Sequence, residues 1–491
     1  MSVFTKEDLK KVVQETLKDH LLIAVSNREP YIHRVSGGKV KWFVPPGGLT
    51  TALDPVLRAC GGLWIAHGSG DADRKTVDTK DHLAVPPDHP SYTLRRIWMT
   101  KEEEAGYYYG AANEMLWPLC HIAYTKPRFS EQDWETYKKI NKRFAEAIIQ
   151  EIQDQRAVIF LQDYHFTLAA KYIKEVLPQT KIALFWHIPW PNPETFRVCP
   201  FKGEILEGLL HNDLIGFHIK SHCENFIQTV DQEIESLINR EQNTIMRQGH
   251  TTLIRDFPIS VDFEKISQEA QSESTLQEIR LIKEKYSLFY EFIGIGVDRI
   301  DYTKGLLEKF MAIDRFLEKY PAYHAKFVFL QAGVLSRIHL KAYKELNEEM
   351  NSLVERINWK YSTDTWTPII LTRIQLEGPS LTAFYRLGDV CMVTSLHDGM
   401  NLVAKEFVSS RFDLSGSLIL SQFTGSSREL AEGAILVNPF DIERSADAIH
   451  MALSLSAEEK KERMAKMREI ISKNNIYRWV AKVITELSKI N

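Results

Sequence analysis

The stretch FIGIGVDRIDYTKG, residues 292–305, is the part of the sequence that decides the fold. Its first six residues are branched apolar side chains, Phe and Gly, which is typical of a buried strand in a parallel sheet. The polar residues that follow predict a turn that opens a helix. Ligands of open parallel sheets lie beyond the carboxyl ends of the strands, so this junction is a candidate site.

Two cations on this turn predict a phosphate clamp. Arg299 and Lys304 are five positions apart, and both can reach one diphosphate. The guanidinium would bind through paired donors, and the ammonium would act as a point charge. The alternative is that both are solvated cations on a loop.

Similar apolar runs recur along the chain, separated by longer helical patterns. The first series covers residues 21–27, 62–67, 157–163, 181–187 and 214–218; the second covers 292–297, 326–333, 368–374, 389–395, 417–423 and 434–438. Strands that alternate with helices predict an α/β fold with parallel sheets covered on both faces. The charged stretch 264–285 is predicted to be helical, and the domain junction is placed near residues 257–260.

Composition limits the function classes. A chain of 491 residues with 44% apolar residues predicts two domains, each with its own core. A net charge of −4 favours neither nucleic acid nor a membrane as partner. The five scattered cysteines lack metal-ligand spacing, so reduced thiols and no zinc site are expected. No signal peptide or membrane-spanning stretch is recognised, which predicts a soluble, cytoplasmic protein.

A second motif, HDGMNLVAKE at residues 397–406, directly follows an apolar strand. Gly399 precedes helix-forming residues, and a helix start offers free N–H groups and a favourable dipole to an anion. Glu406 lies one to two turns further on, where its carboxylate could accept hydrogen bonds from two vicinal ribose hydroxyls. The alternatives are that Asp398 caps the helix and that Glu406 is a surface charge.

Polar residues also end strands in the first half of the chain. Ser26-Asn27-Arg28 ends the first strand, and the glycine-containing segment PPGGLTT at 45–51 opens the next helix. Asp163 and His187 each close an apolar strand, and the prolines after His187 fix the following loop. A carboxylate beside an imidazole favours a hydroxyl-binding site, with a structural histidine as the alternative. An incomplete glycine fingerprint at 294–296 and the lack of a P-loop sequence disfavour hydride transfer and ATP hydrolysis.

These motifs resemble one known family along nearly the whole chain. The ordered set is SNR 26–28, LWP 116–118, DYH 163–165, HIP 187–189, 299–305, 398–406 and NPF 438–440. It is similar to the trehalose-6-phosphate synthases and their relatives, the glucosylglycerol-phosphate synthases, which are retaining GT-B transferases. The resemblance implies two Rossmann-like domains facing each other across a cleft. Residues 1–260 would bind the acceptor, 261–472 the nucleotide sugar, and the helix in 473–491 would cross back to the first domain.

The resemblance also implies residue roles. Donor contacts would come from Gly48, Arg299, Lys304, Asp398, Gly399, Met400, Asn401, Leu402, Val403 and Glu406. Acceptor contacts would come from Arg28, Tyr108, Trp117, Asp163 and Arg337, and catalysis would depend on Arg299, Lys304, His187 and Asp163. The sequence departs from the family at His397, where Arg is usual, and at His67, where Trp is usual. Replacing an indole by an imidazole leaves the identity of the acceptor open.

The expected reaction is transfer of glucose from a nucleotide sugar, most often UDP-glucose among relatives, to glucose 6-phosphate, giving trehalose 6-phosphate with retention. No metal or other cofactor is expected, since the nucleotide sugar is itself a substrate. The leaving diphosphate can take the acceptor proton, so no enzymic nucleophile is required. Glycerol 3-phosphate is the alternative acceptor. A glycoside hydrolase using Asp163 and Asp398 would leave Arg299 and Lys304 unexplained. A sugar-phosphate-sensing regulatory subunit would bind without turnover; whether the chain forms a homo-oligomer stays open.

Overall fold

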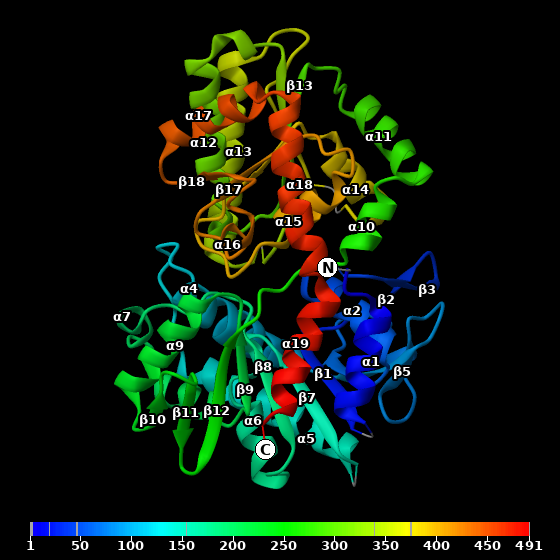
Figure 1. Cartoon of the computed structure of the whole chain (residues 1–491), viewed down its shortest axis with the longest axis vertical. Coiled ribbons are helices and arrows are strands. Elements are labelled where there is room, and N and C mark those ends of the chain that lie inside the picture. Colours follow the sequence, from blue (N-terminus) through cyan, green and yellow to red (C-terminus); the bar gives the residue numbers. More distant parts are fainter. Residues whose placement is uncertain are drawn as a thin grey trace. The chain divides into compact units, whose positions relative to one another are not determined.

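The computed structural model describes residues 3–490 except 19, 46–47, 154, 338 and 374–375. The chain divides into two compact units (Figure 1). The N-terminal unit comprises Phe4–Ile259 and Ile476–Asn491, and the C-terminal unit contains Ser260–Asn475. Each unit has a largely parallel sheet with helices, which confirms the predicted α/β class. Pro46 and Gly47 of the predicted glycine-containing segment lie outside the described residues.

The described part of the C-terminal unit holds a six-stranded parallel sheet in the order β15-β14-β13-β16-β17-β18. Its strands are β13 (Phe292–Arg299), β14 (Phe327–Val334), β15 (Ile369–Thr372), β16 (Val390–Val393), β17 (Ser417–Ser421) and β18 (Ile435–Val437). Renumbered along this unit the order is 3-2-1-4-5-6, that of the Rossmann fold. The strand order reverses between β13 and β16, and a ligand is expected beyond the carboxyl ends of these two strands.

Helices cover both faces of this sheet. They are α10 (Phe263–Glu269), α11 (Glu273–Lys285), α12 (Leu306–Lys319), α13 (Lys341–Tyr361), α14 (Gly378–Leu387), α15 (Leu402–Ser410), α16 (Ser427–Leu430), α17 (Ile442–Ser454) and α18 (Ala457–Lys473), with short turns η4 (Tyr302–Lys304) and η5 (Pro321–Tyr323). Alternate residues of β14 enter different cores: Val328 and Leu330 pack in one cluster, and Phe327 and Phe329 in another. This two-sided burial explains the apolar run at residues 327–330.

The N-terminal unit holds, within its described residues, a ten-stranded sheet in the order β10-β11-β12-β9-β8-β7-β1-β4-β6-β5. Its strands are β1 (Leu21–Arg28), β4 (Leu63–His67), β5 (His82–Val85), β6 (Tyr92–Ile97), β7 (Ala157–Gln162), β8 (Lys181–Phe185), β9 (Leu214–Phe217), β10 (Leu237–Asn239), β11 (Thr244–Arg247) and β12 (His250–Asp256). From β12 to β6 the strands pair in parallel, and antiparallel strands lie at both edges. The order reverses between β1 and β7, so Arg28, the last residue of β1, and Asp163, the residue after β7, lie at a second switch point.

The helices of the N-terminal unit are α1 (Lys6–Leu17), α2 (Gly48–Cys60), α3 (Lys101–Glu104), α4 (Trp117–Cys120), α5 (Glu131–Ile152), α6 (Ala169–Val176), α7 (Pro193–Phe196), α8 (Lys202–Leu209), α9 (Lys220–Glu233) and α19 (Ile476–Ser488). Short turns are η1 (Asp73–Lys75) and η3 (Tyr164–Phe166), and η2 (Ala105–Leu116) is a π-helix. The last helix, α19, contacts α1, α2 and β8. Its Trp479 Nε1 donates a hydrogen bond of 3.1 Å to the carbonyl of Phe257.

The structure contains a hairpin that the sequence analysis did not predict. Strands β2 (Ile32–Ser36) and β3 (Lys39–Phe43) pair antiparallel around Gly37 and Gly38. Both glycines have positive φ, at 59° and 73°, as a two-residue hairpin turn requires. The sequence did contain one signal for this hairpin, namely the glycine pair between the two strands.

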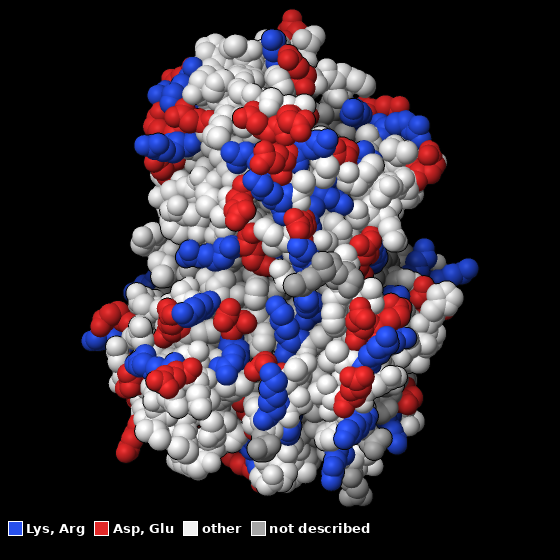
Figure 2. Space-filling model, viewed as in Figure 1, with Lys and Arg blue, Asp and Glu red and all other residues white. Residues whose placement is uncertain are grey.

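Charged side chains are mixed in sign on the face in view, where Lys and Arg lie among Asp and Glu over both units (Figure 2). Among the helices built from described residues, none combines the length and apolar character needed to cross a bilayer.

Candidate functional site

The turn after β13 places the two predicted phosphate-binding cations at the switch point of the C-terminal unit. Arg299 ends β13, and Lys304 ends the η4 turn before α12. Gly305 makes this turn possible, because its φ is +61° and a Cβ there would lie 2.2 Å from the carbonyl oxygen of Thr394. The loop after β16 also bonds to the turn, since the Leu396 N–H donates to the Thr303 carbonyl over 2.8 Å.

Lys304 and Asp398 form an ion pair between these two strand ends, with 2.5 Å between Nζ and Oδ2. Their side chains are 13% and 15% exposed, so solvent still reaches the pair. Asn401 donates to the same carboxylate oxygen over 3.2 Å, and Ser395 donates over 3.3 Å. The carboxylate therefore fixes both the ammonium and the start of α15.

Asn401, rather than Asp398, is the cap of α15. Its φ is +98°, and its Oδ1 accepts from the Ala404 N–H at 3.1 Å. The alternative interpretation of Asp398 as the helix cap is therefore wrong. Leu402 and Val403 form the first turn of this helix, whose N–H groups and dipole favour an anion.

Glu406 is half-buried and hydrogen-bonded, which contradicts its alternative interpretation as a plain surface charge. The buried Tyr385 of α14 donates from its hydroxyl to Glu406 Oε2 over 2.6 Å. Burial raises the pKa of Glu406 to about 7, against the opposing effect of this hydrogen bond. The Tyr385 hydroxyl fixes the position of the Glu406 carboxylate. The sequence did not predict this contact, because Tyr385 lies on α14 and Glu406 lies on α15.

In the N-terminal unit, Asp163 and His187 lie together at the ends of β7 and β8. Asp163 has a φ of +76°, and its Oδ1 accepts from the backbone N–H groups of Tyr164 and His187, each at 3.0 Å. His187 Nε2 lies 2.8 Å from Gln162 Oε1, which can only accept, so Nε2 carries the proton. Burial lowers the pKa of His187 to about 3, so the ring is neutral at physiological pH. Gln162 was also missed, although it is a polar residue at the end of an apolar strand.

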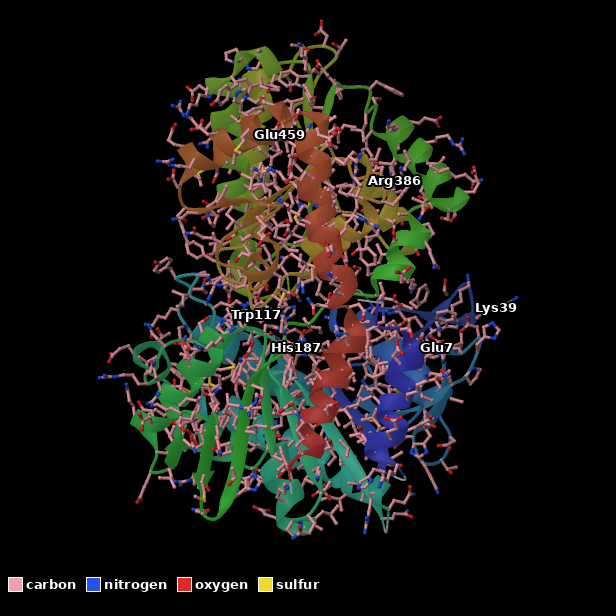
Figure 3. All side chains as sticks on the ribbon, viewed as in Figure 1. Glu7, Lys39, Trp117, His187, Arg386 and Glu459 are labelled. Carbon is pink, nitrogen blue, oxygen red and sulfur yellow. The ribbon has the colours of Figure 1, made fainter. Side chains whose placement is uncertain are left out.

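Aromatic side chains pack beside Asp163. The ring of Tyr108 stacks on His165 at 5.9 Å, and Trp117 lies 6.0 Å from Tyr164. These contacts join η2 and α4 to the η3 turn after β7. Trp117 and His187, both labelled in Figure 3, therefore belong to the same end of the N-terminal sheet.

Arg28 ends β1 directly beside His67, its partner in the parallel register with β4. Burial lowers the pKa of His67 to about 4, against the raising effect of Asp73. The next residue, Glu29, forms a fully buried ion pair with Arg96, at 2.8 Å between Oε2 and Nε. A buried and paired side chain directly after Arg28 fixes the backbone at the end of the strand.

The remaining predicted residues fall into the two units separately. Gly48 begins α2, and Gly399 and Met400 lie in the loop before α15. Arg337 belongs to the C-terminal unit, where its Nη1 donates to the Tyr343 hydroxyl over 2.6 Å. Among the described residues, no cluster of three or more His, Cys, Asp or Glu side chains is arranged to hold a metal ion.

Comparison with known proteins gives a consistent result. The family profile described as Glycosyltransferase family 20 matches residues 20–489. The alpha,alpha-trehalose-phosphate synthase [UDP-forming] of Schizosaccharomyces pombe is 32% identical over 99% of this chain and 93% of its own length. The trehalose-6-phosphate synthase of Mycolicibacterium smegmatis is 34% identical over 95% of this chain and 92% of its own length.

Solved structures of similar proteins also match the fold of this chain. An E. coli structure bound with UDP-2-fluoro glucose has a TM-score of 0.85 and 30% identity, covering 96% of this chain and 99% of that one. A UDP-forming alpha,alpha-trehalose-phosphate synthase of Burkholderia xenovorans, in complex with glucose-6-phosphate, also has a TM-score of 0.85 and 30% identity. It covers 95% of this chain and 99% of its own.

Proposed function

The chain belongs to glycosyltransferase family 20, and on that premise we propose that it transfers glucose from UDP-glucose to glucose 6-phosphate. The products are trehalose 6-phosphate and UDP, and the anomeric configuration is retained. The observation that carries the proposal is the Lys304–Asp398 pair at the switch point of a Rossmann sheet, beside the start of α15. A cation and a helix N-terminus at this place suit a diphosphate.

The donor contacts in this proposal are as follows. Arg299 and Lys304 bind the diphosphate, together with the backbone amides of Leu402 and Val403. Glu406, held by Tyr385, accepts hydrogen bonds from the ribose hydroxyls. Further contacts to the donor come from Gly48, Asp398, Gly399, Met400 and Asn401.

The acceptor contacts are Arg28 and Arg337 for the phosphate, with Tyr108 and Trp117 beside it, and Asp163 for the sugar hydroxyls. Asp163 Oδ1 is fixed by two backbone N–H groups. Its position is therefore set before a substrate arrives, as catalysis by positioning requires.

The proposed step is a front-face substitution. The bond between the anomeric carbon and the diphosphate oxygen breaks, and the acceptor oxygen bonds to the same face of that carbon. The acceptor proton passes to the leaving diphosphate oxygen. Arg299 and Lys304 stabilise the charge that develops there. His187 is neutral, with its proton on Nε2, and so positions the sugar rather than acting as a strong acid. No metal is needed in this scheme, and we place the reaction in the cytoplasm.

Glycerol 3-phosphate is the second candidate acceptor, and His67 is the reason. It lies beside Arg28 in the strand register, where the resemblance predicts an indole. A smaller ring there changes the apolar wall that an acceptor would meet.

The test is UDP release from UDP-glucose in the presence of EDTA, with glucose 6-phosphate and glycerol 3-phosphate supplied separately. GDP-glucose in parallel reports donor choice, and NMR of the product reports anomeric configuration. Release with glucose 6-phosphate and an α,α-linked product supports the proposal. Release with glycerol 3-phosphate alone assigns the second candidate. Binding of UDP-glucose without turnover on either acceptor points to a regulatory subunit and contradicts the proposal.

A further inference from the structure

The C-terminal unit contains a buried group of polar side chains beside the η4 turn, and the proposed reaction assigns a role only to its Arg337. Asp301 is fully buried within the motif that carries Arg299 and Lys304. Tyr343, from the first turn of α13, is 2% exposed. The Arg337 side chain is 6% exposed and belongs to the segment before that helix.

Asp301 is hydrogen-bonded through both carboxylate oxygens. Its Oδ1 accepts from the backbone N–H of Thr303 at 3.0 Å and from the Thr303 hydroxyl at 2.9 Å. Its Oδ2 accepts from the Tyr343 hydroxyl at 3.2 Å and lies 3.6 Å from Arg337 Nη1. One oxygen therefore shapes the η4 turn, and the other anchors the segment that carries Arg337.

Tyr343 is the link between Asp301 and Arg337. Arg337 Nη1 donates to the Tyr343 hydroxyl over 2.6 Å, and the same hydroxyl donates to Asp301. The hydroxyl hydrogen is therefore directed at the carboxylate, which leaves a lone pair for the guanidinium. The guanidinium carbon also lies 5.5 Å from the centre of the Tyr343 ring.

The backbone conformation of Arg337 and the charges around Asp301 are consistent with a preorganised guanidinium. Arg337 has a φ of +50°, a region that non-glycine residues occupy only where surrounding contacts impose it. Burial acts to raise the pKa of the Asp301 carboxyl. The charges of Arg337 and Arg299, the hydrogen bond from the Thr303 N–H and the charge of Lys304, in that order, together outweigh burial and leave this pKa lowered, so Asp301 is ionised at neutral pH.

We propose that Asp301 and Tyr343 are positioning residues that fix Arg337 for the phosphate of the acceptor and tie it to the turn that carries Arg299 and Lys304. The inference rests on the proposed function, in which Arg337 binds that phosphate. Tyr343 acts through Arg337 and does not touch the substrate. An ordered guanidinium binds phosphate with less loss of side-chain entropy, so the effect belongs in the affinity for the acceptor.

The test is a double-mutant cycle with Tyr343→Phe and Arg337→Ala, reading KM and kcat for each substrate. Tyr343→Phe removes one hydroxyl from a buried, charge-assisted network, and it should raise the KM for glucose 6-phosphate about tenfold. The KM for UDP-glucose should change little. In the Arg337→Ala background the tyrosine change should have no further effect on the acceptor KM, because the group it positions is gone.

Tyr361→Phe is the matched control. Tyr361 lies on the same helix, and its hydroxyl donates to the carbonyl of Asp314 over 3.1 Å. This variant should keep both KM values. An additive effect of Tyr343→Phe and Arg337→Ala, or an unchanged acceptor KM in Tyr343→Phe, would overturn the inference.

Two further measurements separate the inference from the proposed function and from misfolding. If the wild-type enzyme does not use glucose 6-phosphate, the proposed function fails, and binding of inorganic phosphate by calorimetry then tests the positioning role. Weaker phosphate binding in Tyr343→Phe, by no more than the loss in Arg337→Ala, supports the inference, and wild-type binding in Tyr343→Phe contradicts it. Asp301→Asn keeps an oxygen for Thr303 but loses the charge. It should raise the acceptor KM at least as much as Tyr343→Phe, and an acceptor KM equal to that of the wild type would remove Asp301 from the proposal.

Discussion

Lys304 and Asp398 are 94 residues apart in sequence, and their Nζ and Oδ2 atoms lie 2.5 Å apart. The pair joins the ends of β13 and β16, the strands on either side of the switch point in the C-terminal sheet. A donor diphosphate bound there would meet an ammonium that is already held in place. Preorganised charge of this kind lowers the barrier because the protein does not have to reorganise during the reaction.

Lys304→Met should lower kcat by about 10²- to 10³-fold, because it removes charge that stabilises the leaving diphosphate. Steady-state UDP release measures the effect. Lys319→Met is the control, since Lys319 forms a similar pair with Asp447 on the outer surface of the same unit, at 2.6 Å. Equal kcat values for Lys304→Met and the wild type would remove Lys304 from the mechanism.

The affinity for the donor should depend on pH through Glu406. Its pKa is raised to about 7 by burial, so the ionised form, which can accept from two ribose hydroxyls, grows as pH rises through that value. The KM for UDP-glucose should therefore fall between about pH 6 and about pH 8, and Glu406→Gln should abolish this dependence. A KM profile that is unchanged in Glu406→Gln would show that another group titrates.

The Glu406 carboxyl should also make the free energy of unfolding depend on pH. The folded-state pKa of Glu406, about 7, is above its ordinary value of 4.5, so the folded protein binds more protons than the unfolded chain between these values. The free energy of unfolding should therefore fall as pH rises from about 4.5 to about 7. Denaturant titration of the wild type and Glu406→Gln isolates this contribution, which should be missing from the variant.

Much of the fold could be predicted from the sequence, because buried parallel strands appear as short apolar runs and their polar ends mark the switch points. FIGIGV at 292–297 and the residues after it show this for β13. The pairs that orient the candidate site could not be predicted in the same way. Tyr385 meets Glu406 across two helices, and Tyr343 meets Asp301 over 42 residues. Such pairs depend on how helices pack, and no local spacing in the sequence encodes them.

Tyr385→Phe should raise the KM for UDP-glucose by about tenfold or less, since it removes one hydrogen bond to a charged group. The acceptor KM should stay unchanged, because Tyr385 contacts Glu406, which is assigned to the ribose. Tyr290→Phe is the control, as its hydroxyl donates to the carbonyl of Thr365. Equal changes in both KM values in Tyr385→Phe would indicate a general loss of structure instead.

Gly305→Ala should destabilise the protein through the turn that presents Lys304. The backbone there has a φ of +61°, and the new Cβ would lie 2.2 Å from the Thr394 carbonyl oxygen, which is backbone and cannot rotate away. The expected loss in the free energy of unfolding is about 1–3 kcal/mol. Gly203→Ala is the matched control, because Gly203 lies within α8 with nothing within 4 Å of the added Cβ. That variant should be at least as stable as the wild type, because alanine favours a helix more than glycine does. Chemical denaturation of both variants measures the difference, and equal stability of the two would show that Gly305 is not required by the turn.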